Sequence, residues 1–407
     1  MTDAVWWRVQ IRVLTSTGRL LLLGALAFDP LGGQDLEVTG YALGVGTWAA
    51  ESPLGPSGVT LLGRGRVMPI VVMGGVTVDV AYEHVASRTP TGGGLSVTTP
   101  GGEGAGGGDW LGTEWVIRST ARSLWRHRFD RLALSFETGP VSVTLGRQAI
   151  SWATTMFLTP ADPFAPFDPS DPFREYRGGV DAIRIRIFPG PFSEVETVLR
   201  ATDTTEGDKV TALARGQTSR GGWAFGAWAG VIHEEAAGAL FATGAAGATA
   251  LRVEASLRED RQGEGATIRA TFGVDRNFIV KGKDLILVAE IQHDGLGATR
   301  SSDLLDVVMS KWFARGEMQV LGRWSVAVQT GYQIHPLVSV QAVALGNLLD
   351  GSTLLAPAIG WSATESMSLR LGFFAGTGPG GLEPEAWLQS EYGSIPVLGY
   401  ASMSWYF

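Results

Sequence analysis

The sequence predicts an all-β fold, a single antiparallel transmembrane β-barrel, and three observations lead to this prediction. Apolar side chains recur at every second residue in many segments. Mean hydropathy is slightly positive at +0.13, although no apolar run approaches the roughly 18 to 20 residues of a membrane-spanning helix. The chain also ends on a short alternating segment whose last residue is aromatic.

The alternation gives each predicted strand two different faces. In segment 75–83, Val and Tyr residues alternate with Gly, Thr, Asp, Ala and Glu, and segments 323–334 and 366–373 repeat the pattern. Residues i, i+2 and i+4 of a strand share one face, so one face is apolar and the other is polar. An apolar face fits lipid, and a face with Gln, Arg, Asp and Glu fits a water-filled interior. In lipid an open sheet edge leaves backbone groups unsatisfied, so the sheet must close.

The last eleven residues, 397–407, place Ala401, Met403, Trp405 and Phe407 on one face. This segment resembles the C-terminal strand by which outer-membrane barrels are recognised for assembly. The resemblance implies a bacterial outer-membrane location and the barrel-assembly machinery as a partner. Outer-membrane lipid and lipopolysaccharide would then surround the barrel.

The N-terminal segment has the features of an export signal. Three arginines precede a short apolar run at 20–27, which ends in the A-x-A-like cleavage site Ala25-Leu26-Ala27. Cleavage before Gln34 is an equal alternative. We therefore predict a signal peptide at 1–34 and an outer-membrane β-barrel over 35–407. The alternative is a first core strand or a buried helix.

The number of strands follows from the alternating segments and the turns between them. Single-chain bacterial barrels usually have an even number of strands, so one of 17 candidates is wrong or one strand is missed. We expect about 16 strands, within a range of 14 to 18, and place the error between 110 and 130 or between 190 and 250. The candidates are 36–48, 71–84, 115–128, 131–138, 141–150, 181–188, 194–201, 208–215, 222–232, 246–257, 266–276, 284–293, 320–334, 338–346, 353–362, 366–375 and 397–407.

Four long connections stand out from the short turns, and one of them is rich in proline and aspartate. Segment 88–113 is very rich in glycine, whereas 160–173 reads PADPFAPFDPSDPF. Proline removes backbone donors, so the second segment is no barrel strand. We predict that it folds inward and narrows the pore; an ordered external loop is the alternative, and we expect no metal there. The predicted constriction residues are Asp162, Asp168, Asp171, Arg174 and Arg177.

Arginines form the main candidate for chemistry in the lumen. Arg118, Arg122 and Arg126 share a face in a strand and also in a helix, and Arg184 and Arg186 alternate with isoleucines. Rings of arginine or lysine in a pore favour anions and phosphates. The alternative is a lumen of mixed sign, in which these arginines pair with nearby acids. The available acids are Glu137, Asp181, Glu194 and Glu196.

Several other classes of protein are disfavoured. A net charge of −8 and a pI near 5.3 argue against nucleic acid as a partner. The chain has no cysteine, so it forms neither a disulfide nor a thiolate metal site. Its five histidines are scattered and no nucleophile elbow or HExxH motif occurs, so we expect neither an enzyme nor a cofactor.

Several segments together resemble the outer-membrane barrels of the alginate-export and phosphate-selective porin group. In alginate exporters an arginine-rich lumen conducts an acidic polysaccharide, and Arg147, with Gln148 beside it, is the position that the resemblance carries over to this chain. The matching segments are LGRQAISW (145–152), the proline-aspartate loop, YRGGVD (176–181), YQIHPL (332–337), NLLDGS (347–352), SEYG (390–393) and the final WYF (405–407).

These expectations converge on a porin-like channel for the passive passage of hydrophilic, anionic solutes. The alternative is a secretion barrel for an acidic exopolysaccharide. A third hypothesis is a closed structural barrel whose Gly-rich loops serve attachment. The predicted pore-lining residues are Arg118, Arg122, Arg126, Arg147, Gln148, Arg184 and Arg186.

Overall fold

The computed structural model describes residues 34–53, 55–89, 108–164, 173, 175–204, 207–260, 265–380 and 388–407. The predicted signal peptide lies outside the described residues apart from Gln34, which is the first residue of β1. No helix within the described part of the chain is long and apolar enough to cross a membrane.

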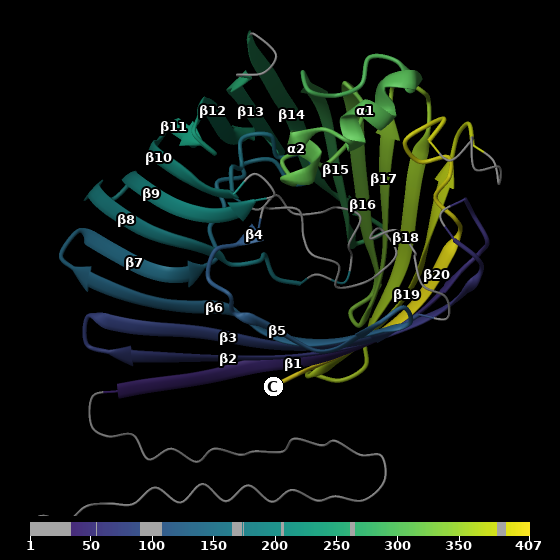
Figure 1. Ribbon diagram of the computed structural model, residues 1–407, viewed down its shortest axis with the longest axis horizontal. Coiled ribbons are helices and arrows are strands. Elements are labelled where there is room, and N and C mark those ends of the chain that lie inside the picture. Colours follow the sequence, from purple (N-terminus) through teal and green to yellow (C-terminus); the bar gives the residue numbers. More distant parts are fainter. Residues whose placement is uncertain are drawn as a thin grey trace, which may run out of the picture.

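Eighteen antiparallel strands close into one barrel (Figure 1). Each strand pairs with its neighbours along the chain, β3 pairs with β6, and β20 pairs with β1 to close the ring. The barrel strands are β1 (Gln34–Ala49), β2 (Gly58–Met73), β3 (Val76–Arg88), β6 (Ser123–Thr138), β7 (Val141–Gln148), β8 (Val180–Gly190), β9 (Ser193–Thr204), β10 (Gly207–Arg220), β11 (Trp223–Ile232), β12 (Glu235–Ala246), β13 (Thr249–Asp260), β14 (Gly265–Val280), β15 (Lys283–Asp294), β16 (Trp324–His335), β17 (Val338–Asn347), β18 (Thr353–Ser362), β19 (Met367–Thr377) and β20 (Leu398–Tyr406).

A few short elements lie outside this ring. The two-residue strand β4 (Gly108–Asp109) pairs with β9, and β5 (Glu114–Thr120) forms a hairpin with β6. Between β15 and β16 lie three short helices: η2 (Ser301–Asp303), α1 (Leu304–Val308) and α2 (Lys311–Ala314).

Closure of the barrel depends on the aromatic C-terminus. Beyond the register of β1 with β20, the backbone N–H of Gly40 donates to the carbonyl of Phe407 at 2.9 Å, and the N–H of Phe407 donates back at 3.0 Å. The Phe407 ring occupies the place where a β-carbon on Gly40 would project, so a glycine is required there. The terminal strand predicted at 397–407 is therefore confirmed.

The connections differ at the two ends of the barrel. The end that carries the start of β1 and the C-terminus has tight turns, such as Gly74-Gly75 and Gly221-Gly222, and we name it the turn end. The opposite end, the loop end, carries the long connections 149–179, 295–323 and 378–397. In outer-membrane barrels the short turns are periplasmic and the long loops are extracellular.

The side chains alternate between the two faces of the wall as predicted. Outward positions such as Leu61, Leu240 and Ile268 are apolar and more than half exposed. Inward positions such as Glu254 and Gln292 are polar and fully buried. An inward polar residue is buried here because a loop occupies the lumen.

The structure corrects three strand assignments. The segments predicted at 115–128 and 131–138 are the hairpin β5–β6, in which β6 runs unbroken through 123–138. Two strands were missed: β2, whose apolar residues at 67–73 are consecutive rather than alternating, and β12, which is mostly Ala and Gly. Both composition and pattern are poor indicators of a strand in these cases.

Candidate functional site

The chain between β7 and β8 enters the barrel (Figure 1). Its backbone binds a carboxylate of the opposite wall. Glu290 projects inward from β15 and is 3% exposed. Its carboxylate accepts three consecutive backbone N–H groups, from Met156 (2.6 Å), Phe157 (3.0 Å) and Leu158 (2.9 Å). Hydrogen bonds to an ionised acceptor are roughly twice as strong as neutral ones, so this is a firm anchor.

A second carboxylate holds the loop from the neighbouring part of the wall. Glu254 on β13 is fully buried and accepts from the backbone N–H groups of Thr155 (2.7 Å), Ala161 (3.1 Å) and Thr154. The loop amides thereby replace the water that a buried carboxylate would otherwise need.

Donors from other strands bind the carbonyl groups of the same loop. These donors lie on four different strands of the wall, far apart in sequence. The loop therefore crosses the lumen and does not lie on the rim. The inward-folded loop predicted from its prolines is therefore confirmed. The bonds are Trp228 Nε1 to Ala161 O (2.9 Å), Arg200 Nη1 to Phe164 O (3.0 Å), Arg252 Nη1 to Thr154 O (3.1 Å) and Arg64 Nη1 to Phe173 O (2.9 Å).

Aromatic contacts fix the loop on two sides of the barrel. Trp152 lies edge-on to Phe164 at 4.8 Å between ring centroids and also approaches Trp228 on β11. On the other side, Phe173 lies edge-on to Tyr400 of β20, also at 4.8 Å. The described parts of the loop thus form a partition with packed apolar contacts at both sides.

The predicted constriction residues fall partly within this partition. Asp162 accepts from Arg177 Nη1 at 2.7 Å and from Ser151 Oγ at 2.9 Å, so it joins the two halves of the loop. The other three predicted residues, Asp168, Asp171 and Arg174, lie outside the described residues.

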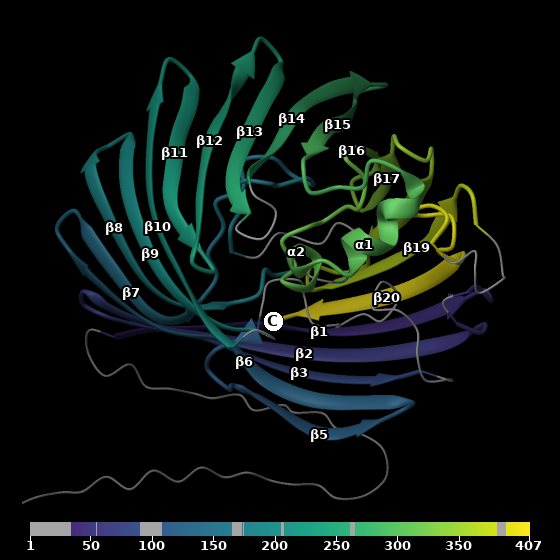
Figure 2. The ribbon, with the colours of Figure 1, turned by 45° about the horizontal axis from the view of Figure 1, so that its top comes forward.

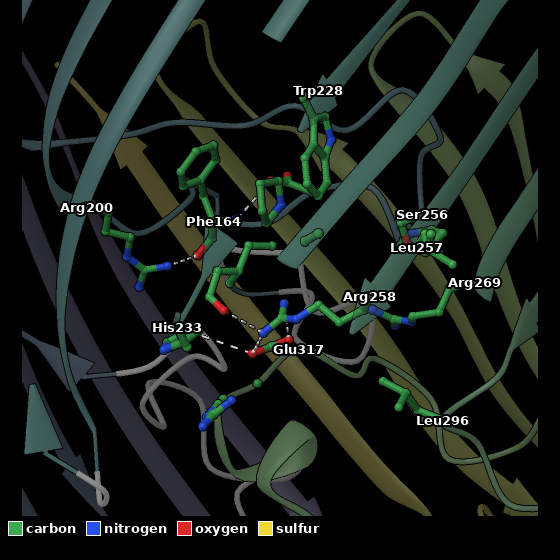
Figure 3. A pocket seen from close by; sticks show the side chains of 17 residues that line it. Phe164, Arg200, Trp228, His233, Ser256, Leu257, Arg258, Arg269, Leu296 and Glu317 are labelled. Carbon is green, nitrogen blue, oxygen red and sulfur yellow. Dashed lines mark hydrogen bonds and ion pairs between the residues drawn. The ribbon is translucent and has the colours of Figure 1, made fainter. Parts of the chain in front are cut away.

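A pocket lies beside the loop at the loop end of the lumen (Figure 3). It has about 560 Å³ of empty space, part of it open to solvent. Residues from the loop, from strands β9 and β11 to β14, and from the connection between β15 and β16 line it. The charged residues of its lining are Asp162, Arg200, Arg258, Arg269, Arg315 and Glu317.

Four arginines therefore face two acids around this pocket. Arg258 pairs with Glu317, Nη1 to Oε2, at 2.8 Å, and Arg269 pairs with Asp294, Nη2 to Oδ2, at 2.8 Å. Asp294 is not part of the lining, but it offsets part of the positive charge. Within the lining arginines outnumber acids, but Glu235, behind it, lies 3.4 Å from Arg258 and 3.7 Å from Arg315 and, like Asp294, offsets part of this charge.

His233 lies in the turn between β11 and β12, and its pKa depends on its burial and on the charges of this pocket. Burial, followed by the positive charges of Arg315, Arg200 and Arg258, lowers the pKa of His233 to about 3. The imidazole is therefore neutral at physiological pH. A proton on His233 is disfavoured first because the ring is buried, and then because the surrounding arginines repel it.

Arg147 and Gln148 are locked within the barrel wall. The Arg147 side chain is 1% exposed; it pairs with Asp181 at 2.7 Å and with Asp109 of β4 at 2.7 Å, and donates to the carbonyl of Leu111 at 2.8 Å. Gln148 is also buried and donates to the carbonyl of Ala182 at 3.1 Å. Arg147 thus ties β4 and the segment after it to β8.

The remaining predicted pore residues divide into two groups. Arg126 faces inward and pairs with Glu114 at 3.0 Å, and Arg184 pairs with Glu196 at 2.6 Å, as the mixed-sign alternative proposed. Arg186 is half-buried and approaches the hydroxyl of Ser142 at 3.4 Å.

Arg118 and Arg122 are exposed and do not lie inside the barrel. They belong to the β5–β6 hairpin, whose turn at 121–122 interrupts the alternation on which their assignment to the lumen depended. For these two residues the pore-lining assignment is corrected.

Sequence reasoning did not select the four arginines of the pocket. Arg258 shares its inward face with Glu254 and Ser256, so the alternation within β13 contained the signal. Arg315 lies in a long connection without periodicity, and no sequence pattern indicates its place in the lumen.

No protein-family model and no curated protein sequence matches this chain. Solved structures with the same fold are outer-membrane channels. OccAB1 of Acinetobacter baumannii superposes with a TM-score of 0.56 at 6% identity, covering 91% of this chain and 96% of that protein. A BenF-like porin of Pseudomonas fluorescens Pf-5 gives 0.54 at 10% identity, with 93% and 99% covered. OpdK of Pseudomonas aeruginosa, solved with vanillate, gives 0.51 at 10% identity, with 92% and 98% covered.

The chain thus has the fold of an outer-membrane porin, and its closed sheet with an apolar outer face places it in the bacterial outer membrane. The similar structures do not support the alginate-export or phosphate-selective group in particular.

Proposed function

We propose that this barrel is an outer-membrane channel for the passive passage of small hydrophilic anions. The observation that carries the proposal is the arginine-lined pocket beside the inserted loop. A solute that enters this pocket lies beside Arg258, Arg269 and Arg315 and beside the inserted loop, which lines the same pocket. Fixed positive charge in a narrow, partly desolvated site lowers the electrostatic barrier for an anion and raises it for a cation.

Size selection follows from the loop. In its described part, backbone N–H groups between 154 and 161 are bound by Glu254 and Glu290, and Trp152 and Phe164 are packed, so this part narrows the lumen. This arrangement suits small solutes better than a polymer, and an exopolysaccharide secretion barrel is not favoured. Among proteins with the same fold, OpdK has been solved with vanillate and OccK2 (OpdF) with glucuronate, and these two compounds are suitable anionic probes here.

The experiment is recording from single channels of purified, refolded protein in planar bilayers. A KCl gradient should give a reversal potential of the sign expected for anion preference, and the double variant Arg258→Gln/Arg269→Gln should move it towards cation preference. Lys281→Gln, in an exposed turn at the turn end, is the matched control and should leave it unchanged.

Two results would overturn the proposal. Cation preference of the unaltered protein would contradict the role of the arginines. The absence of any unitary conductance, with correctly folded protein, would instead support the closed structural barrel.

A further inference from the structure

The outer surface of the β3–β6–β5 sheet changes character towards the loop end. Opposed residues of antiparallel strands share a face, and the register aligns His84, His127 and Trp115 in one outward row. The next row towards the loop end holds Trp125 and Arg118. The outward side chains thus change from aromatic to basic towards the loop end.

The row beyond Trp125 holds Arg88, opposite Ser123, and Arg122 lies in the adjacent turn. The backbone N–H of Thr89 donates to the carbonyl of Arg122 at 2.9 Å, so these two arginines lie close together. Figure 2 shows β5 beside β6 at the edge of the barrel wall, away from the lumen. Both faces of β5 are exposed.

The three arginines of this hairpin tip, Arg88, Arg118 and Arg122, have exposed side chains. None of them forms an ion pair with an acid among the described residues; the nearby Glu114 is bound to Arg126 on the inner side. This contrasts with the inward arginines of the same strands, which are paired: Arg126 with Glu114 and Arg128 with Glu83. A basic cluster without an acidic partner among the described residues, next to exposed tryptophans, is suited to bind a ligand that has both an anionic group and an apolar part.

We propose that the hairpin tip binds a phosphorylated, acylated glycolipid of the outer leaflet, the lipid A part of lipopolysaccharide. The basic tip is complementary in charge to its phosphates. The tryptophan rows lie on the same continuous outer face that meets the hydrocarbon layer, where aromatic residues mark the membrane interface.

The spacing fits this ligand. A strand rises about 3.3 Å per residue, so successive outward rows are about 7 Å apart along the strand. Measured from the row of Arg88, Trp125 lies one row and Trp115 two rows further from the loop end, and Arg118 shares the row of Trp125. The tryptophans thus lie level with or below the arginines, as acyl chains lie below the phosphates of the glycolipid. The bilayer would bury the exposed tryptophans, which are 46% and 42% exposed in the isolated chain.

The test measures binding of purified lipid A to the refolded full chain in detergent, by native mass spectrometry. We expect the triple variant Arg88→Gln/Arg118→Gln/Arg122→Gln to bind about tenfold more weakly than the unaltered protein. The triple lysine variant should restore most of the affinity, because lysine also binds phosphate. Arg220→Gln is the matched control: Arg220 is exposed and opposes Trp223 in a hairpin at the turn end, and its removal should have no effect.

Heat-modifiable migration in gel electrophoresis verifies that each variant has folded. Equal binding of lipid A by the triple glutamine variant would overturn the proposal. So would equal binding of dephosphorylated lipid A by the unaltered protein. Stable dimers that dissociate in the triple glutamine variant would also overturn it, because they would identify the tip as a contact between copies. Channel selectivity is tested at other residues, so a negative result for lipid A binding would not contradict the proposed channel function.

Discussion

Replacement of Glu290 by glutamine should loosen the inserted loop without unfolding the barrel. The carboxylate accepts three backbone N–H groups of residues 156–158, and a hydrogen bond to a charged group contributes about 1.5 to 3 kcal/mol. Glutamine keeps one acceptor oxygen but turns an amide group towards donors, so the loss corresponds to one or two bonds, about 3 kcal/mol. Since 1.4 kcal/mol is a factor of ten, the population with a released loop rises roughly a hundredfold.

Single-channel recording detects this change directly. The Glu290→Gln channel should show frequent transitions to states of higher conductance, because the partition leaves its position for part of the time. Glu137→Gln is the control, since Glu137 is exposed beside a tight turn at the turn end. Steady conductance of the Glu290→Gln channel, indistinguishable from that of the control, would refute the reasoning that this carboxylate holds the loop.

Three further predictions concern the wall, the loops and closure. Arg147→Ala leaves Asp181 buried without its partner, so the barrel should lose about 3 to 5 kcal/mol of stability, measured by urea unfolding; an unchanged midpoint would contradict this. Burial raises the pKa of Glu391 to about 7, well above the ordinary value of 4.5. Ionisation is therefore disfavoured in the folded loops, so this group's contribution to stability declines as the pH rises through 4.5 to 7, by about 3 kcal/mol. Hydrogen-exchange protection of the Leu321 and Gly322 amides should be lower at pH 8 than at pH 5, and Glu391→Gln should remove the difference. Gly40→Val would place a side chain against the Phe407 ring and should reduce the yield of heat-modifiable barrel, whereas Gly44→Val, where the space is open, should not.

The fold could be predicted because lipid imposes a strict period on the sequence. Alternation identifies a strand wherever its outward residues are large and its inward residues are polar, as in segment 323–334. It fails in β12, where Ala and Gly occupy both faces, and in the β5–β6 hairpin, where the turn Ala121-Arg122 carries neither Gly nor Pro. The strand count of 18 therefore lies at the upper end of the range that the sequence indicated.

The site was predictable only in part, because its contacts are distant in sequence. Proline content alone shows that 160–173 is no strand, and satisfaction of its backbone groups requires protein or water around it. Its anchors, however, lie about 100 residues away in Glu254 and more than 130 residues away in Glu290. Local pattern contains no information about which inward carboxylate meets which loop amide.

The anchoring scheme also explains how an acidic chain can have a pocket with four arginines in its lining. The chain carries a net charge of −8, yet Glu254 and Glu290 face the amides of the inserted loop rather than the solute. These carboxylates are occupied by backbone donors, so their oxygens point at the loop and are not available to a solute in the pocket. Arg258 and Arg269, on the adjacent strands β13 and β14, remain at the edge of the pocket. The loop therefore does more than narrow the pore: it covers two acids of the same wall, which leaves Arg258 and Arg269 as the charged groups of β13 and β14 that line the pocket.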